Sequence, residues 1–216
     1  MTKKSLISAT LAGALTLTSG FYAVKSGQIA FPVPYYTVAR IIDGDTFVTT
    51  EKQYIRLSST YAPELENCLG MESKKALEKL VMGKKVYLKV LYRDAYQRLI
   101  SLVYTPDGYI NEQMITQGMA YYLPKNKEEI APLQQASQIA RDQKIGIYSS
   151  LCTQQTNTLN PKCNIKGNVS INGKFYRTPN CGQYNITILQ LYLDDRWFCS
   201  EKEAEKAGFV KGGDCK

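Results

Sequence analysis

The chain contains no histidine, and this excludes several common kinds of active site. Ser–His–Asp and Cys–His triads, imidazole general bases and histidine-ligated metal centres all need that residue. Any catalysis must therefore use carboxylates, Arg, Lys, Tyr or Cys, or a metal held by oxygen or sulfur. Side chains of this kind gather at four places: Asp43-Gly44-Asp45, Arg56, Pro63-Glu64 and the run from Asp94 to Arg98.

The first place is an acidic turn in the run Ile42-Asp43-Gly44-Asp45-Thr46. Two nearby carboxylates, together with backbone oxygens, are the ligands that a hard cation such as Ca²⁺ prefers. An Asp-Gly pair between two strands is also an ordinary turn. The motif alone is therefore compatible with a cation site and with a simple turn.

The other three places supply two arginines and a glutamate. Arg56 lies in a short apolar run, where an unpaired charge is costly, and Glu64 follows it by eight residues. Arg98 ends the polar run Asp94-Ala95-Tyr96-Gln97-Arg98. A surface ion pair would explain each residue alone. Together they are the parts of a histidine-free phosphodiesterase, because guanidinium groups bind phosphate oxygens and a carboxylate can take a proton from attacking water.

Hydrophobic period and turn signals predict the elements that must position these residues. Residues of β type cover 35–42, 46–50, 54–57, 86–91 and 99–104, with turns between them. Helical periods cover 70–82, 110–118 and 128–143. Strands with helices inserted and appended predict an α+β fold, and we expect a small barrel.

The order of the motifs resembles the staphylococcal nuclease (thermonuclease) family. The resemblance rests on I-D-G-D-T, then R-L with P-E eight residues after the arginine, then D-x-Y-x-R and N-E-x-x-I-x-x-G-x-A. It covers about residues 35–150, and we assign 31–152 to this domain. The resemblance implies a five-stranded OB-type β-barrel with three helices that cleaves DNA and RNA, typically with Ca²⁺.

The resemblance also assigns catalytic roles. Arg56 and Arg98 match the two phosphate-binding arginines, and Glu64 matches the glutamate usually assigned as general base. Tyr96 matches a tyrosine that lines the nucleotide pocket. We therefore expect water activated by Glu64 to attack phosphorus while the two arginines hold the phosphoryl oxygens.

The expected metal site departs from the family pattern. Asp45 matches the Ca²⁺-ligating aspartate, and Asp43 matches a second carboxylate behind it. The family usually has another ligating aspartate two residues before the proline, where this chain has Tyr61 followed by Ala62. Losing a carboxylate ligand lowers the affinity for a hard cation. We therefore predict Ca²⁺ at an incomplete site. Gln97 also replaces the family's usual glycine before the second arginine.

Three classes of function remain open. The first is an exported nuclease that hydrolyses DNA and RNA with the help of a cation. The second is a catalytically weak or inactive OB-type module that binds nucleic acid, since OB barrels bind single strands without chemistry. The third is a purely structural domain. A binding module has no need of Arg56, Glu64 and Arg98 together, which favours the enzyme, and no obligate protein partner is evident.

Charge adds little to this choice. The chain carries 27 Lys and Arg against 19 Asp and Glu, a formal net charge of +8. The basic residues are spread along the sequence and do not form one cluster. Diffuse basicity is a weak indication of nucleic acid or another anionic partner, and taken alone it favours an ordinary solvated surface.

The first 30 residues are typical of a targeting segment. Lys3 and Lys4 precede residues 5–24, which are apolar or small and carry no charge. This pattern fits a cleaved signal peptide and also fits an uncleaved membrane anchor, while a buried helix of the fold is a third interpretation. The first two place the rest of the chain outside the cytoplasm, either secreted or anchored to the outer face of the cytoplasmic membrane.

Six cysteines follow this segment, an even number that suits disulfides in an oxidising environment. The resemblance implies a Cys68–Cys152 bridge, because exported relatives often carry cysteines at these two places. Two unrelated cysteines are the alternative. The last four lack the close pairs of a zinc site, so we expect them to pair among themselves, in an order left open: Cys163, Cys181, Cys199 and Cys215.

The C-terminal quarter of the chain predicts a separate module. Residues 153–162 are polar and have the composition of a linker, and 163–216 form a small Cys-rich segment. Such a segment is too short for a large hydrophobic core, so we expect disulfides to stabilise it. It resembles a small module attached to some bacterial exported nucleases. Its aromatic residues suit either the core of a tiny fold or a face for nucleic acid or cell wall.

Overall fold

The structure is a computed structural model that describes residues 34–125 and 130–216. The predicted targeting segment, 1–30, lies outside the described residues. In the part that is described, no helix combines the length and the apolar character needed to cross a membrane.

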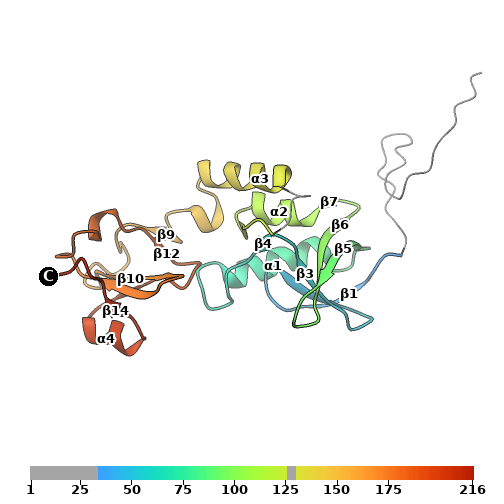
Figure 1. The fold of residues 1–216 in the computed structure, drawn as a ribbon. Helices are drawn as coiled ribbons and strands as arrows, with labels where there is room; N and C mark the ends of the chain where they lie inside the picture. The colour runs from blue at the N-terminus through green and yellow to red at the C-terminus, as the bar shows by residue number, and fades with distance from the viewer. Residues whose placement is uncertain (1–33, 126–129) are drawn as a thin grey trace, which may run out of the picture. The chain divides into compact units, whose positions relative to one another are not determined.

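A six-stranded sheet forms the base of the nuclease-like part (Figure 1). Five strands follow the order β1-β2-β3-β6-β5, and the short β7 pairs with β6. All neighbours are antiparallel except β3 and β6, which are parallel. The strands are β1 (Val38–Ile41), β2 (Thr46–Thr49), β3 (Tyr54–Leu57), β5 (Tyr87–Arg93), β6 (Leu99–Thr105) and β7 (Gly108–Tyr109).

The two edges of this sheet meet at a single point. Tyr36, just before β1, forms an antiparallel bridge with Val86, just before β5. The pairing does not extend along β1, because the chain bulges between Val38 and Arg40 while it pairs with β2. The expected closed barrel of five strands is thus a curved sheet of six, joined edge to edge by one bridge among the described residues.

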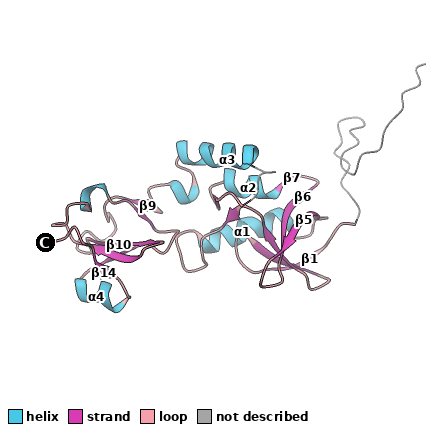
Figure 2. Cartoon of the chain, in the orientation of Figure 1, coloured by secondary structure: helices cyan, strands magenta, loops and turns pink. Residues whose placement is uncertain are grey.

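Three helices pack beside this sheet, as expected: α1 (Gly70–Val81), α2 (Ile110–Thr116) and α3 (Ile130–Asp142) (Figure 2). The alternation of the strands decides which face the helices cover. Ile55 and Leu57 of β3 are buried in the core together with Leu77 of α1 and Met114 of α2. Side chains alternate between faces along a strand, so Arg56 projects from the opposite face.

A short ribbon completes this part of the fold. β4 (Thr60–Tyr61) pairs with β8 (Tyr121–Tyr122) in antiparallel register, with Tyr61 opposite Tyr121. The close approach of two turns fixes the chain after α2. A Cβ on Gly118 would lie 2.4 Å from the carbonyl oxygen of Ile145, and Gly118 has a φ of +62°. Only glycine combines that conformation with that contact.

The C-terminal part has its own four-stranded sheet, in the order β13-β10-β11-β14. Its elements are β10 (Ile165–Ser170), β11 (Gly173–Arg177), β13 (Arg196–Phe198), α4 (Glu201–Lys206) and β14 (Val210–Lys211). Ser200 caps α4, because its hydroxyl accepts the N–H of Glu203. A small core of Ile165, Tyr176, Phe198, Ala204 and Phe209 lies between α4 and the sheet.

One disulfide lies in the nuclease-like part of the chain and two lie in the C-terminal part. The structure pairs Cys68 with Cys152, Cys163 with Cys199, and Cys181 with Cys215. Within the stretch predicted as a linker, β9 (Thr153–Gln154) pairs with β12 (Leu189–Gln190). Short 3₁₀ turns lie at Gly146–Tyr148 and Tyr184–Ile186.

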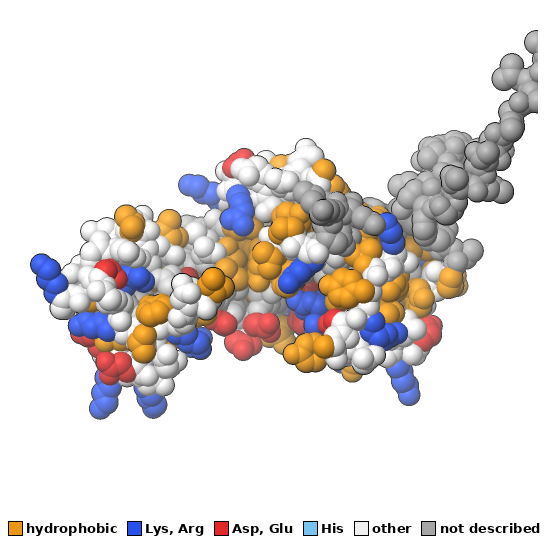
Figure 3. Space-filling model, viewed as in Figure 1, with side chains coloured by type: hydrophobic (Ala, Val, Ile, Leu, Met, Phe, Trp, Pro, Cys, Tyr) orange, Lys and Arg blue, Asp and Glu red, His pale blue; other side chains and the backbone are white. Residues whose placement is uncertain are grey.

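One aromatic and one basic residue of the C-terminal part, Tyr176 and Lys166, are held by contacts within that part. Tyr176 is buried and its hydroxyl bonds to the carboxylates of Glu201 and Glu205. Lys166 is 1% exposed, and its Nζ donates to the carbonyl oxygens of Tyr184 and Thr187, at 2.9 and 2.6 Å. On the face drawn in Figure 3, Lys and Arg side chains are spread among apolar ones without forming a single patch.

Candidate active site

The acidic turn between β1 and β2 is held against α1. The carbonyl oxygen of Thr46 accepts the N–H groups of Ile42 and Asp43, and the Asp43 carboxylate accepts the N–H of Asp45 at 2.9 Å. A Cβ on Gly44 would lie 1.9 Å from the Ser73 Oγ, so only glycine lets the turn approach the helix this closely. The turn thereby places the Asp45 side chain in a buried position.

Asp45 and Arg56 form an ion pair at the centre of the site. Thr46 lies opposite Arg56 in the β2–β3 register, which brings the guanidinium beside the turn. Arg56 Nη1 and the Thr46 hydroxyl both donate to Asp45 Oδ1, while the Ala62 N–H donates to Oδ2 at 3.0 Å. Burial raises the pKa of Asp45, and the charge of Arg56 opposes that shift. Asp45 therefore orients Arg56 and compensates part of its charge.

A second aspartate orients the second arginine in the same way. Asp94 Oδ1 accepts the N–H groups of Tyr96 and Arg98, and Oδ2 accepts Nε and Nη2 of Arg98 at 2.9 and 2.8 Å. Burial would raise the Asp94 pKa, but these hydrogen bonds and the Arg98 charge outweigh it, so the pKa is lowered. Gln97, where the family usually has glycine, adopts a left-handed φ of 63° to complete this loop.

The parallel pairing of β3 and β6 brings the two arginines to one face. Arg56 lies opposite Ile100, and Arg98 is two residues before Ile100. Arg98 immediately precedes β6, and continuing the alternation of that strand backwards by one residue assigns it to the face that carries Arg56. Tyr96 is 81% exposed, and Arg98 lies over its ring at 5.3 Å from the centroid. The face thus offers two guanidinium groups and an exposed ring next to the second of them.

Glu64 lies on a tight turn that leads into α1. Its carbonyl oxygen accepts the N–H of Asn67, and a Cβ on Gly70 would lie 1.9 Å from the same oxygen. The Glu64 carboxylate is exposed, and the described residues offer it no hydrogen-bond donor. Its charge reaches Tyr121, whose pKa is raised by burial first and then by neighbours that include Glu64. Glu64 is therefore free to accept a proton beside the same cluster of residues.

Tyr61 occupies the position where the family usually has its second ligating aspartate. Its ring stacks on Tyr121 with centroids 5.5 Å apart, and Arg56 lies over it at 5.1 Å. Tyr61 therefore contacts the same guanidinium that Asp45 holds. It brings an aromatic face where a charged oxygen ligand would be needed.

Comparison with known proteins matches residues 54–150 to the family model described as staphylococcal nuclease homologue. An uncharacterized endonuclease of Escherichia coli is 36% identical over 117 residues, which are 52% of this chain and 75% of that protein. The chain belongs to the staphylococcal nuclease family. As a member it is a nuclease, an enzyme that hydrolyses phosphodiester bonds.

More distant relatives support the same assignment for this staphylococcal nuclease homologue. An uncharacterized endonuclease of Haemophilus influenzae is 35% identical over 116 residues, covering 52% of this chain and 65% of that protein. A probable staphylococcal-like nuclease, CAN4, of Oryza sativa subsp. japonica is 31% identical over 106 residues, or 49% of this chain and 21% of that protein. The matched region contains Arg56, Glu64 and Arg98, but not the C-terminal module.

The residues of this staphylococcal nuclease homologue do not fit the calcium site typical of its family. Both oxygens of Asp45 accept hydrogen bonds, one of them from Arg56, and Tyr61 supplies no carboxylate. Among the residues that the structure describes, no group of three or more His, Cys, Asp and Glu is placed to hold a metal ion. We therefore derive no catalytic step through Ca²⁺.

The residues that position the site differ in whether the sequence could reveal them. The pairing of Asp94 with Arg98 had a local signal, because acid and base are separated by four residues. The N–H of Ala62 and the ring of Tyr121 had none, since both reach the site through the β4–β8 ribbon. Ser73 likewise reaches Gly44 only through the packing of α1 on the turn.

Proposed function

We propose that this nuclease hydrolyses both DNA and RNA by direct attack of water on phosphorus. Glu64 takes one proton of the attacking water as the new P–O bond forms, and Arg56 and Arg98 bind the phosphoryl oxygens. One ester P–O bond breaks, and the leaving sugar oxygen takes a proton from solvent. One observation supports this most strongly: one arginine lies in β3, the other directly precedes the neighbouring β6, and each is oriented by its own aspartate. A nucleic-acid-binding surface needs positive charge but not guanidinium groups fixed in this way.

The two arginines act most strongly in the transition state. Attack of water places additional negative charge on the phosphoryl oxygens, and fixed donors stabilise that charge without reorganisation. Arg56 uses only Nη1 toward Asp45, and Arg98 uses Nε and Nη2 toward Asp94. Each guanidinium therefore keeps N–H groups for a phosphate oxygen. A guanidinium remains charged at all physiological pH values, so it needs no proton transfer.

The substrate class follows from what these groups recognise. Two guanidinium groups and a carboxylate address the phosphodiester and the attacking water, neither of which differs between DNA and RNA. Tyr96 offers an exposed ring on which a base can stack, and stacking accepts every base. No step of the proposal is routed through a metal ion, because both Asp45 oxygens already accept hydrogen bonds and Tyr61 supplies no carboxylate.

We also propose that the protein acts outside the cytoplasm. The sequence of residues 1–30 predicts export, either with a signal peptide that is cleaved or with an uncleaved membrane anchor. Six cysteines in three disulfides suit an oxidising environment. Fractionation of cells that express the full chain, with blotting of the membrane and extracellular fractions, tests this. Retention of the chain in the cytoplasm would contradict it.

The test of the catalytic proposal uses the chain folded under oxidising conditions. Single-stranded DNA, duplex DNA and RNA are incubated with it in Ca²⁺, in Mg²⁺ and in EDTA. Glu64→Gln should lower the cleavage rate by about 10²- to 10⁴-fold, the usual contribution of a general base. Glu66→Gln is the matched control, because this exposed glutamate lies two residues further along the same loop.

Two results would contradict the proposal. Equal losses in the Glu64 and Glu66 variants would show that charge on the loop matters but that Glu64 is not the base. Retained oligonucleotide binding without cleavage under every condition would favour the nucleic-acid-binding module instead.

A further inference from the structure

The loop that carries Glu64 is held by the C-terminal end of the chain. Cys68 forms the disulfide with Cys152, and its N–H donates to the carbonyl oxygen of Leu191 at 3.1 Å. Asn67 Nδ2 donates to Asp194 Oδ1 at 2.8 Å, which joins residues 127 positions apart. Asn67 also closes the turn on Glu64 through its own N–H. The position of this turn therefore depends on residues of the C-terminal module.

The partner of this loop, residues 189–197, is itself firmly placed, and we call it the bracing segment. Asp195 is buried and accepts the N–H groups of Val169 and Gln190, at 2.7 and 2.8 Å. β12 pairs with β9 at one end of the segment, and β13 pairs with β10 at the other. The bracing segment is therefore fixed at both ends by sheets and in the middle by a buried carboxylate.

The bracing segment also supports the other side of the site. Tyr192 is buried, and its ring centroid lies 6.0 Å from that of Tyr121 and 5.9 Å from that of Tyr148. Tyr121 in turn stacks on Tyr61, which lies under Arg56. A continuous series of aromatic contacts thus runs from the bracing segment to the arginine that pairs with Asp45.

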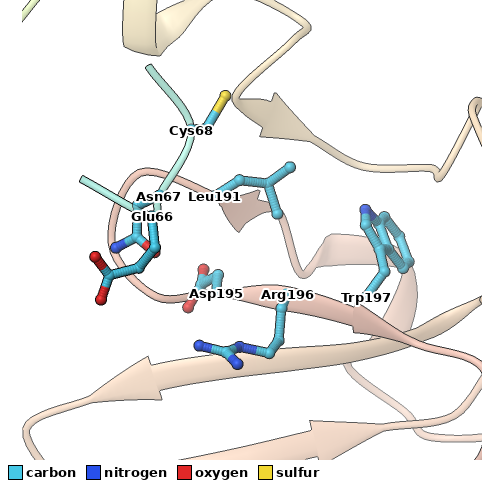
Figure 4. Close-up of a pocket in the computed structure, with 7 residues that line it drawn as sticks. All are labelled: Glu66, Asn67, Cys68, Leu191, Asp195, Arg196 and Trp197. Carbon is cyan, nitrogen blue, oxygen red and sulfur yellow. The ribbon is translucent and has the colours of Figure 1, made fainter. Parts of the chain in front are cut away.

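A cavity of about 430 Å³ lies between the Glu64 loop and the bracing segment. Figure 4 shows Glu66, Asn67 and Cys68 on one side of it, and Leu191, Asp195, Arg196 and Trp197 on the other. The lining holds two carboxylates, of Glu66 and Asp195, and one guanidinium, of Arg196, so it does not suit a phosphate. The junction is therefore better suited to hold the loop than to bind substrate.

We propose that the bracing segment positions the nuclease site, with Asn67 and Asp194 as positioning residues that act on Glu64. This gives the C-terminal module a role in catalysis without contact with the substrate. The inference rests on the proposed function, because it takes Glu64 as the base. It predicts that weakening the Asn67–Asp194 contact lowers turnover but leaves substrate binding unchanged.

Asp194 offers a matched pair of variants. Its φ is 66°, a left-handed conformation that glycine and asparagine both adopt readily, so neither substitution adds backbone strain. Asp194→Gly removes the acceptor of the Asn67 amide, whereas Asp194→Asn keeps a side-chain oxygen there. We expect kcat to fall by about 3- to 10-fold in Asp194→Gly, the factor that corresponds to one lost hydrogen bond, with KM unchanged. Asp194→Asn should restore most of the rate.

The second readout needs no substrate. Hydrogen exchange of the backbone amides in residues 64–69 should become faster in Asp194→Gly and not in Asp194→Asn. Hydrogen exchange therefore tests the bracing segment separately from catalysis. If the natural chain showed no nuclease activity but Asp194→Gly still exchanged faster, the catalytic role of Glu64 would be refuted and the positioning by the bracing segment would stand. Unchanged exchange in residues 64–69 would overturn the brace, whatever the activity.

A double variant tests whether the effect passes through Glu64. If Asp194 acts by positioning the base, Asp194→Gly should cause no further loss in a Glu64→Gln background. The same fold-loss in both backgrounds would overturn the proposal, because it would show a general effect on the fold. A rise in KM with kcat unchanged would also overturn it, because it would place Asp194 in substrate binding.

Discussion

Replacing Tyr61 with aspartate should strengthen calcium binding beside Asp45. The variant supplies the second carboxylate that the family usually has, next to Asp45. It also removes the ring that stacks on Tyr121 and lies under Arg56. Without that ring, Arg56 is less firmly held against Asp45, and two adjacent carboxylates attract a hard cation.

The expected energies follow from the contacts that are lost and gained. Stacking on Tyr121 contributes about 0.5–1.5 kcal/mol, and the contact with Arg56 about 0.5–2 kcal/mol. Without calcium, Tyr61→Asp should therefore lower the free energy of unfolding by about 1–3.5 kcal/mol. If the site in this variant binds Ca²⁺ with a dissociation constant of about 10⁻⁴ to 10⁻³ M, roughly 10 mM Ca²⁺ would raise the free energy of unfolding by about 1.4–2.7 kcal/mol.

Urea unfolding with and without Ca²⁺ measures these differences. Tyr61→Asn is the matched control, because it loses the same ring but adds no charge. Calcium should stabilise the aspartate variant by at least about 1 kcal/mol more than it stabilises the natural chain or the asparagine variant. A calcium shift in the natural chain as large as in Tyr61→Asp would refute the reasoning, because it would show that Arg56 does not block Asp45. No shift in either would show that Tyr61 is not what prevents binding.

Three further predictions concern other parts of the molecule. Arg98→Ala should lower turnover by about 10²-fold and oligonucleotide affinity by less than about 10-fold, measured by single-turnover cleavage and filter binding; equal losses would indicate a binding protein. Burial lowers the pKa of Lys166, so the unfolded state holds its proton more tightly and the free energy of unfolding should rise with pH toward the ordinary value of 10.5. Lys166→Met should remove that component in urea unfolding at several pH values, and an identical pH dependence in both proteins would contradict the assignment. Replacing Cys68 and Cys152 with serine opens a loop of 84 residues and should cost about 4–5 kcal/mol of unfolding free energy in the loop-entropy model, whereas a loss below about 1 kcal/mol would speak against that model here.

Local patterns predicted most of the elements around the site. The strand of residues 54–57 and the helix that begins at 70 were predicted within a residue or two, because apolar period and turn residues act over short distances. The motif from Asp94 to Arg98 was also visible, since its hydrogen bonds all lie within one loop.

Long-range contacts could not be predicted in the same way. The stacking of Tyr61 on Tyr121 depends on the register of β4 and β8, which no local signal specifies. Within the part of the chain that the structure describes, the edges of the large sheet meet only through Tyr36 and Val86, whereas the order of strands and helices predicted a small barrel. The resemblance to the family supplied the roles of the site residues but nothing about the bracing segment.

The contact between Asn67 and Asp194 has a consequence for the order in which the chain is made. Synthesis proceeds from the N-terminus, so Arg56, Glu64 and Arg98 all leave the ribosome well before Asp194, which follows Arg98 by 96 residues. A nascent chain can thus contain every proposed catalytic side chain while the Glu64 turn still lacks its last support. Full activity would then depend on completion of the polypeptide, and truncated products of translation would be poor nucleases.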